Sequence, residues 1–230
     1  MTKKNIKSKR YQQSLELFDC NKEYNLVDGL NIICNDFKNT NFNETVELTV
    51  QLDKKYLKNN PLVKGSTKLP YNIGKNKNII VFTEDKETAI SSGAIDAGLE
   101  DLIEKIKEKK INFDCVLSTT FGFDFARKVA DILGPKNLMP SKKNETITDK
   151  INEAIKEIQN GKIDYKMDKF GNIALGIGKV TMGTDKLLNN LKNVINDIKQ
   201  RTKNNIIKKV YVSRSMSPGV KIDIKYIDKS

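Results

Sequence analysis

The sequence predicts an α/β protein with two domains, and three observations lead to this fold class. The chain has 230 residues, which is enough for two domains of ordinary size. Between residues 72 and 160, short apolar runs alternate with segments of helical periodicity, the pattern of parallel strands joined by helices in a small three-layer domain. The first 70 residues differ, because two helical segments there precede a strand in which polar and apolar residues alternate.

Two helices and one strand are predicted in this N-terminal segment. Ser8–Phe18 and Val27–Phe37 carry apolar residues at helical spacing. In Thr45–Leu52 every second residue is apolar, which predicts a half-buried strand. A polar bridge over Asp53–Pro61 follows, and Tyr71–Gly74 has the composition of a break in the chain. The crossing into the second domain is placed at this break.

The middle segment contains the alternation of strands and helices. The predicted elements are strand Asn78–Phe82, helix Lys86–Gly93, helix Leu99–Lys109, strand Cys115–Ser118, helix Phe123–Leu133 and helix Asp149–Asn160. Gly161 is expected to cap the last of these helices, because glycine adopts the left-handed backbone conformation that often ends a helix.

The C-terminal segment is again a mixture of strands and one long helix. The predicted elements are strands Lys162–Met167 and Asn172–Thr181, helix Asp185–Thr202, and strands Ile206–Met216 and Lys221–Ile227. The glycines of the second strand do not form a nucleotide-binding loop. Ile177 stands where a phosphate loop needs lysine, and Thr181 stands where a dinucleotide fingerprint needs its third small residue. These glycines are expected to allow close packing or backbone approach to a ligand.

The chain is strongly basic, with a formal charge of +12 and a pI near 9.4. The positive charge is spread along the sequence and is almost all lysine, which favours a polyanionic partner such as nucleic acid over a membrane surface. Residues 1–10 are basic and free of acidic residues, so they resemble either an RNA-contacting arm or a transit peptide. No apolar run approaches the length of a membrane span, and a soluble, unexported protein is expected.

The composition also excludes most catalytic chemistry. The chain has no histidine, which removes triads, dyads and zinc sites that need an imidazole. Cys20, Cys34 and Cys115 lack the spacing of a metal site and are expected to be buried, reduced thiols. No catalytic residue, metal or cofactor is therefore predicted.

The most specific motif is Gly134-Pro135-Lys136-Asn137-Leu138-Met139-Pro140, which predicts a rigid, exposed loop directly after a helix. It resembles the GP-x-x-LMP signature of the ribosomal protein L1 family, and the likeness extends over nearly the whole chain. The resemblance implies an α+β domain built from both termini, residues 1–71 and 161–230. A Rossmann-like three-layer α/β/α domain, residues 72–160, is then inserted between them. Two crossings of the chain between these domains would form a hinge. No feature of the sequence suggests a stable homo-oligomer, so the free protein is expected to be a monomer.

The family's ribosomal RNA surface can be matched residue by residue. Residues 42–47, Phe-Asn-Glu-Thr-Val-Glu, are similar to the family's F-x-E-T-V-E segment, with Asn41 in place of its usual lysine. The resemblance implies that Phe42 packs against RNA and that Glu47 accepts a bond from a ribose 2′-hydroxyl. Without this resemblance, the sequence pattern predicts that Phe42 is a core residue and that Glu47 is a solvated strand residue.

A second matched segment is Ser215-Met216-Ser217-Pro218-Gly219, which resembles the family's T-M-G-P turn. The hydroxyl of Ser215 keeps the hydrogen bond that threonine offers, whereas Ser217 replaces a glycine and would be strained if its φ had to be positive. A plain hairpin turn is the alternative. Weaker matches assign Lys64, Asp168 and Lys169 to the same RNA surface.

In the inserted domain, Lys136, Lys142 and Lys143 keep the region of the Gly-Pro loop basic. The resemblance implies that this region meets transfer RNA, and a solvated charged loop is the alternative reading. The family further implies a non-enzymatic component of the large ribosomal subunit that binds the rRNA of the mobile stalk and assists release of deacylated tRNA from the exit site. It also implies repression of translation through the protein's own mRNA.

Other functions and locations stay open at this point. A free basic RNA-binding protein or RNA chaperone would share the charge but would have no preference for stalk RNA, and an enzyme would need a nucleotide site in the middle domain. The abundance of lysine, asparagine and isoleucine suggests an AT-rich genome. The expected location is the ribosome of the bacterial cytoplasm, with an organellar ribosome as the alternative.

Overall fold

A computed structural model describes residues 8–37, 40–53, 63–74, 77–202 and 206–224. Most of the predicted polar bridge, the first seven residues and the end of the last predicted strand lie outside these ranges. The described residues form both helices and strands, as expected of an α/β protein. The predicted fold class is therefore confirmed. No helix in the described ranges is long and apolar enough to cross a membrane.

The chain forms two compact units. The first contains the described residues of Met1–Val63, Leu69–Gly74 and Tyr165–Ser230, and the second contains those of Lys64–Lys68 and Lys75–Asp164. The sequence assigned residues 64–68 and 161–164 to the first domain, but in the structure they belong to the second unit. Residues 72–74 were assigned to the second domain and belong to the first unit. Residues 64–68 form strand β2, which pairs with β6 (Lys162–Lys166) and contacts the 3₁₀ turn η2 (Lys142–Asn144).

The first unit is built on a four-stranded antiparallel sheet in the order β7-β1-β8-β9. Its strands are β1 (Thr45–Leu52), β7 (Asn172–Lys179), β8 (Ile207–Arg214) and β9 (Val220–Ile222). The even-numbered residues of β1, from Val46 to Leu52, are at most 1% exposed, whereas the odd-numbered ones are exposed or half-buried. One face of the sheet is therefore core and the other is open.

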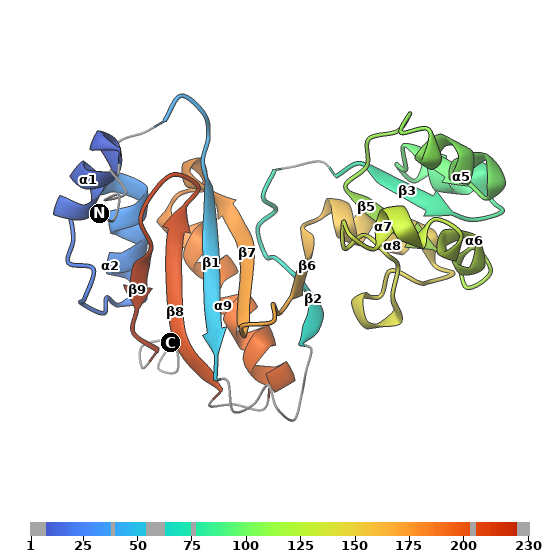
Figure 1. Cartoon of the computed structure of the whole chain (residues 1–230). Helices are drawn as coiled ribbons and strands as arrows, with labels where there is room; N and C mark the ends of the chain where they lie inside the picture. The colour runs from blue at the N-terminus through green and yellow to red at the C-terminus, as the bar shows by residue number, and fades with distance from the viewer. Residues whose placement is uncertain (1–7, 38–39, 54–62, 75–76, 203–205, 225–230) are drawn as a thin grey trace, which may run out of the picture. The chain divides into compact units, whose positions relative to one another are not determined.

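Helices cover the core face (Figure 1). They are α2 (Leu26–Asn31) and α9 (Thr184–Thr202), which contact each other and the strands at the two edges of the sheet. A third helix, α1 (Lys9–Glu16), is capped by Ser8, whose hydroxyl accepts from the Tyr11 amide at 3.3 Å. The helix predicted over Val27–Phe37 is α2 followed by one π-helical turn, η1 (Ile32–Asp36).

The second unit has a three-stranded parallel sheet in the order β4-β3-β5. Its strands are β3 (Ile79–Phe82), β4 (Asp96–Gly98) and β5 (Cys115–Ser118), and its helices are α4 (Lys86–Ser91), α5 (Glu100–Lys107), α6 (Phe123–Arg127), α7 (Ala130–Leu133) and α8 (Ile151–Gln159). Ile79 and Val81 of the central strand join a core with α8, and Ile80 and Phe82 join a second core with α5 and α6. A sheet with a core on each face is the predicted three-layer arrangement.

Two details of this unit differ from the prediction. Strand β4 was not predicted, because Asp-Ala-Gly has no apolar run. The helix predicted over Phe123–Leu133 is two short helices that are interrupted at Lys128 and Val129. Gly161 follows α8 with φ of 101°, as its predicted capping role requires.

Candidate nucleic-acid interface

Two large apolar side chains are exposed at one end of the first unit's sheet. Phe42, three residues before β1, is 54% exposed, and Met216, two residues after β8, is 57% exposed. The two strands are antiparallel with Val46 opposite Arg214, so the start of β1 lies beside the end of β8. Ser215 N donates to Thr45 O at 3.1 Å and joins the two loops. The fold thus brings Phe42 to the same end of the sheet as Ser215 and Met216, which follow it by more than 170 residues in sequence. We call this end of the sheet the Phe42–Met216 surface.

Hydroxyl groups and an ammonium group surround these apolar side chains. The Ser215 hydroxyl accepts from Thr45 N at 3.3 Å, and Lys179 Nζ donates to Thr45 Oγ1 at 2.8 Å. Asn43 Nδ2 donates to the hydroxyl of exposed Thr181 at 2.9 Å. Sequence reasoning missed Lys179 and Thr181, because only the antiparallel register of β7 places Lys179 opposite Thr45.

Ser217 fits its turn without strain. It is absent from the described non-glycine residues with positive φ, so the position does not require glycine. Its hydroxyl accepts from Arg214 N at 2.8 Å, and its own amide donates to Arg214 O at 3.2 Å. The serine therefore closes the turn that presents Met216.

Glu47 lies exposed on the open face of the sheet. It is opposite Ser213 of β8 on one side and Gly176 of β7 on the other. Glu47 is the second residue after Thr45, so its side chain is on the same face of β1 as that of Thr45. Glu47 therefore extends the Phe42–Met216 surface along the open face.

A buried pair of charges lies directly beneath this surface. Arg214 and Glu44 are each 2% exposed. Arg214 donates to Cys34 O at 2.6 Å and to Phe37 O at 3.3 Å, the carbonyls at the end of η1. Glu44 Oε1 accepts from Arg10 of α1 at 2.8 Å. These contacts fasten the start of β1 to two helical segments and hold the Phe42 loop in place.

The electrostatics of this pair keep both groups charged. Burial alone would raise the pKa of Glu44, but the hydrogen bonds and charges of Arg10, Thr40 and Arg214 outweigh it and lower the pKa. Burial lowers the pKa of Arg214, and the charge of Glu44 opposes that shift. Sequence reasoning missed Arg214 as well. Its signal was a charged residue at an apolar position of the alternating strand 206–216.

Two of the remaining rRNA candidates, Asp168 and Lys169, lie at the opposite end of the sheet. Asp168 and Lys169 lie in the hairpin between β6 and β7, and β7 begins opposite Gln51, near the end of β1. The eight residues of β1 separate its two ends by roughly 25 Å. Val63, directly before Lys64, accepts from Met167 N at 2.8 Å. The structure therefore separates Asp168 and Lys169 from Phe42, and it places Lys64 in strand β2 of the second unit.

Asp168 is engaged within its own turn. Its Oδ1 accepts from the amides of Phe170 and Asn172, each at 2.8 Å, and its Oδ2 accepts from Asn172 Nδ2 at 3.1 Å. Gly171 adopts φ of 89° at the corner. Burial tends to raise the pKa of Asp168, but these hydrogen bonds prevail and lower it. Its carboxylate shapes the hairpin, while the neighbouring Lys169 is exposed.

The Gly-Pro loop of the second unit follows α7 directly, and its first four residues, Gly134 to Asn137, are exposed. Its remaining residues pack against the domain: Leu138 and Met139 contact the core with α5 and α6, and Pro140 is buried. Lys136 Nζ lies 5.5 Å from the centre of the Phe113 ring. Lys142 is exposed in η2, and the side chain of Lys143 is outside the described part of the chain.

The described residues offer no site for metal chemistry, since no three metal-ligating side chains among them gather in one place. Two of the cysteines are at least partly buried as expected, and burial raises the pKa of Cys115 to about 11. The prediction is wrong for Cys20, which is exposed in the loop after α1. In β7, a Cβ at Gly178 would lie 2.5 Å from Leu187 Cδ2, so this glycine allows close packing with α9.

Comparisons with known proteins identify the family of the chain. The chain matches the sequence model of the ribosomal protein L1p/L10e family over residues 34–218. It is 39% identical over 223 residues to the large ribosomal subunit protein uL1 of Phytoplasma australiense, covering 94% of this chain and 97% of that protein. It is 35% identical over 223 residues to the uL1 protein of Thermosipho africanus (strain TCF52B), covering 94% and 96%. Identity to the uL1 protein of Lawsonia intracellularis (strain PHE/MN1-00) is 37% over 197 residues, covering 82% and 83%. The chain therefore belongs to the ribosomal protein L1 family.

Proposed function

We propose that the chain is a structural protein of the large ribosomal subunit that binds the rRNA of the mobile L1 stalk through the Phe42–Met216 surface. The observation that carries the proposal is that two exposed apolar side chains, Phe42 and Met216, flank the same end of the sheet, where the start of β1 lies beside the end of β8. The assignment is supported by three bacterial relatives that are named as proteins of the large ribosomal subunit. The family is one of structural RNA-binding proteins, and the chain is not an enzyme.

The chemistry around these residues suits RNA. An exposed ring gives a base or sugar a stacking partner, and Lys179 supplies a positive charge for phosphate. The Ser215 hydroxyl and the Glu47 carboxylate accept hydrogen bonds, and Glu47 suits a ribose 2′-hydroxyl donor. The net charge of +12 adds long-range attraction to the polyanion. Lys169, at the far end of the sheet, and Lys64, in strand β2 of the second unit, contribute further phosphate contacts, and Asp168 holds the hairpin that presents Lys169.

The second unit has a separate proposed partner. Lys136 and Lys142, together with Lys143, meet the exit-site tRNA as it leaves the ribosome in deacylated form. The exposed start of the Gly-Pro loop and the basic character of the region support this role. The stalk-binding surface also binds a site in the protein's own mRNA and represses its translation. The free protein is a monomer of the bacterial cytoplasm, from an organism with an AT-rich genome, and an organellar ribosome is the alternative location.

The test compares equilibrium binding of Phe42→Ala, Ser215→Ala and the unaltered chain to a stalk rRNA fragment. Phe42→Ala is expected to weaken binding by about 10- to 100-fold, because loss of one stacking contact costs about 1–3 kcal/mol. Ser215→Ala is expected to weaken it by about tenfold, through one lost hydrogen bond. The matched control is Phe121→Ala, since Phe121 is 55% exposed and lies in the second unit. It is expected to change the affinity by less than about twofold.

The same measurement with an unrelated hairpin of equal length, across a salt series, separates this proposal from a free RNA chaperone. Preference for the stalk by about a hundredfold that persists at high salt supports a specific rRNA surface. Equal affinities and salt slopes for both RNAs, with no effect of Phe42→Ala, would contradict it.

A further inference from the structure

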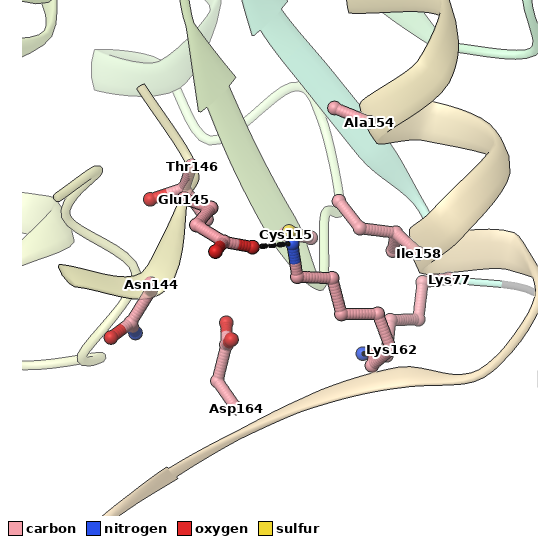
Figure 2. A pocket seen from close by; sticks show the side chains of 9 residues that line it. All are labelled: Lys77, Cys115, Asn144, Glu145, Thr146, Ala154, Ile158, Lys162 and Asp164. Carbon is pink, nitrogen blue, oxygen red and sulfur yellow. Dashed lines mark hydrogen bonds and ion pairs between the residues drawn. The ribbon is translucent and has the colours of Figure 1, made fainter. Parts of the chain in front are cut away.

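The second unit contains a buried lysine that takes no part in the proposed RNA contacts. The side chain of Lys162, at the start of β6, is 11% exposed. Its ammonium group donates to Glu145 Oε2 at 2.7 Å and to Glu157 Oε2 of α8 at 3.2 Å (Figure 2 shows the first contact). A second lysine, Lys77, donates to the carbonyl of Lys162 at 2.7 Å. Lys162 thus joins three segments of the unit: the turn after the Gly-Pro loop, helix α8 and strand β6.

The cavity beside this lysine is too small to be a ligand site. It has a volume of about 10 Å³, room for no more than one water molecule. Its walls include Cys115, Ala154 and Ile158, which are buried in the core or at its edge. The charged groups gathered here cannot serve a substrate or cofactor, so their role must be within the chain.

The segment that Lys162 holds is the basic turn that we propose to face tRNA. Glu145 ends η2 in a left-handed conformation, with φ of 55°. On either side of η2, Ser141 N donates to Thr146 Oγ1 at 2.8 Å, and Thr146 N donates to Ser141 O at 3.2 Å. These bonds close Ser141–Thr146 into a compact loop that carries the exposed Lys142. Within this loop, Glu145 reaches the buried lysine.

We infer that Lys162 is a positioning residue, which fixes the Ser141–Thr146 loop so that Lys142 presents its charge in one arrangement to tRNA. This inference rests on the proposed tRNA contact. Burial would lower the pKa of Lys162, but its bonds to Glu145 and Glu157 outweigh that effect and raise it, so the contact persists through the physiological pH range. A loop that is already ordered loses less conformational freedom when it binds, and its affinity is correspondingly higher.

The experiment compares the full chain with Lys162→Met and Lys162→Arg. Methionine keeps most of the apolar stem and removes the charge, whereas arginine keeps the charge. Glu145 and Glu157 have side chains 69% and 46% exposed, so the methionine variant leaves no carboxylate stranded in the core and is expected to fold. The matched control is Lys150→Met, because Lys150 is 76% exposed and pairs with Glu153 on the surface of α8.

Hydrogen exchange by mass spectrometry is read over residues 141–147, and binding to deacylated tRNA is measured in the same buffer. Lys162→Met is expected to speed exchange of the Thr146 amide by about tenfold or more, through local opening of the loop. It is also expected to weaken tRNA binding by about three- to tenfold. Lys162→Arg should restore both values toward those of the unaltered chain, and Lys150→Met should change neither.

The outcomes separate this inference from the proposed function. Unchanged exchange in Lys162→Met overturns the positioning role, whatever the tRNA result. Faster exchange with unchanged tRNA affinity overturns the link between loop order and binding. Absence of tRNA binding by the unaltered chain refutes the proposed tRNA contact and with it the functional part of the inference, while the exchange rates still report whether Lys162 orders the loop.

Discussion

Replacement of Arg214 by methionine is expected to lower the free energy of unfolding by about 2–5 kcal/mol, because each of two carbonyls that lose a charged donor inside the protein costs about 1–3 kcal/mol. The Arg214 guanidinium satisfies the carbonyls of Cys34 and Phe37 at the end of η1 and lies near the buried Glu44. Without it, two carbonyls lose their donor, and Glu44 loses a nearby positive charge while it keeps its bond to Arg10. Urea denaturation followed by circular dichroism measures the change.

The matched control is Arg127→Met in the second unit. The side chain of Arg127 is 68% exposed and pairs with Asp124 at 3.7 Å on the surface of α6, so its loss is expected to cost at most about 0.5 kcal/mol. A loss below about 1 kcal/mol for Arg214→Met would mean that water or neighbouring groups replace the guanidinium. Because the same cluster fastens the Phe42 loop, Arg214→Met is also expected to weaken binding to stalk rRNA, even at temperatures where the variant is folded.

The regular elements with a clear apolar pattern could be predicted from the sequence. Strand β1 begins and ends at the predicted residues, Thr45 and Leu52, because the alternation of its side chains is uninterrupted. Strand β5 agrees equally well over Cys115–Ser118, since it is a short apolar run between polar segments. Elements without such a signal were missed. The three residues of β4 form a strand because they pair with β3, which the sequence does not show. The π-helical turn η1 has the same apolar spacing as an α-helix and so could not be told from one.

The candidate site was predictable only in part, because motif resemblance names residues without saying which of them meet. Phe42 and Ser215 were matched separately and lie together, owing to the antiparallel pairing of β1 with β8. Asp168 and Lys169 were matched just as readily but lie at the other end of the sheet. Lys179 belongs to no motif that was recognised, and it reaches the surface through the register of β7. Strand register, a property of the folded sheet, therefore decided which candidates form one surface.

Substitution of alanine for Gly122 is expected to destabilise the second unit by about 3 kcal/mol, although the backbone there suits any residue. Gly122 precedes α6 with φ of −63°, so the conformation itself imposes no strain. An added Cβ would lie 2.1 Å from Phe82 O and 2.7 Å from Phe82 C, where it would overlap main-chain atoms of the central strand. Overlap with main chain forces a backbone shift, which typically costs up to about 3 kcal/mol.

The position of Phe82 O is fixed from two other directions, which is why relaxation is expected to be poor. It accepts from Thr119 N at 3.0 Å and from Thr119 Oγ1 at 3.3 Å, and Phe82 itself is fully buried in the core with α5 and α6. The loop before α6 must move instead, and it takes with it Ala126, which is also fully buried against this core. The added methyl group is therefore expected to displace α6 from the parallel sheet that it covers.

Gly219→Ala is the control for this effect, because a Cβ at Gly219 would have its nearest neighbour, Tyr211, at 3.9 Å, and φ there is not positive. Its free energy of unfolding is expected to stay within about 0.5 kcal/mol of the unaltered chain, or to rise slightly as the unfolded state loses freedom. Urea denaturation of both variants measures the difference. Equal stability of the two would show that β3 and the loop before α6 can separate at little cost, and the close approach at Gly122 would then not be needed to hold the three layers together.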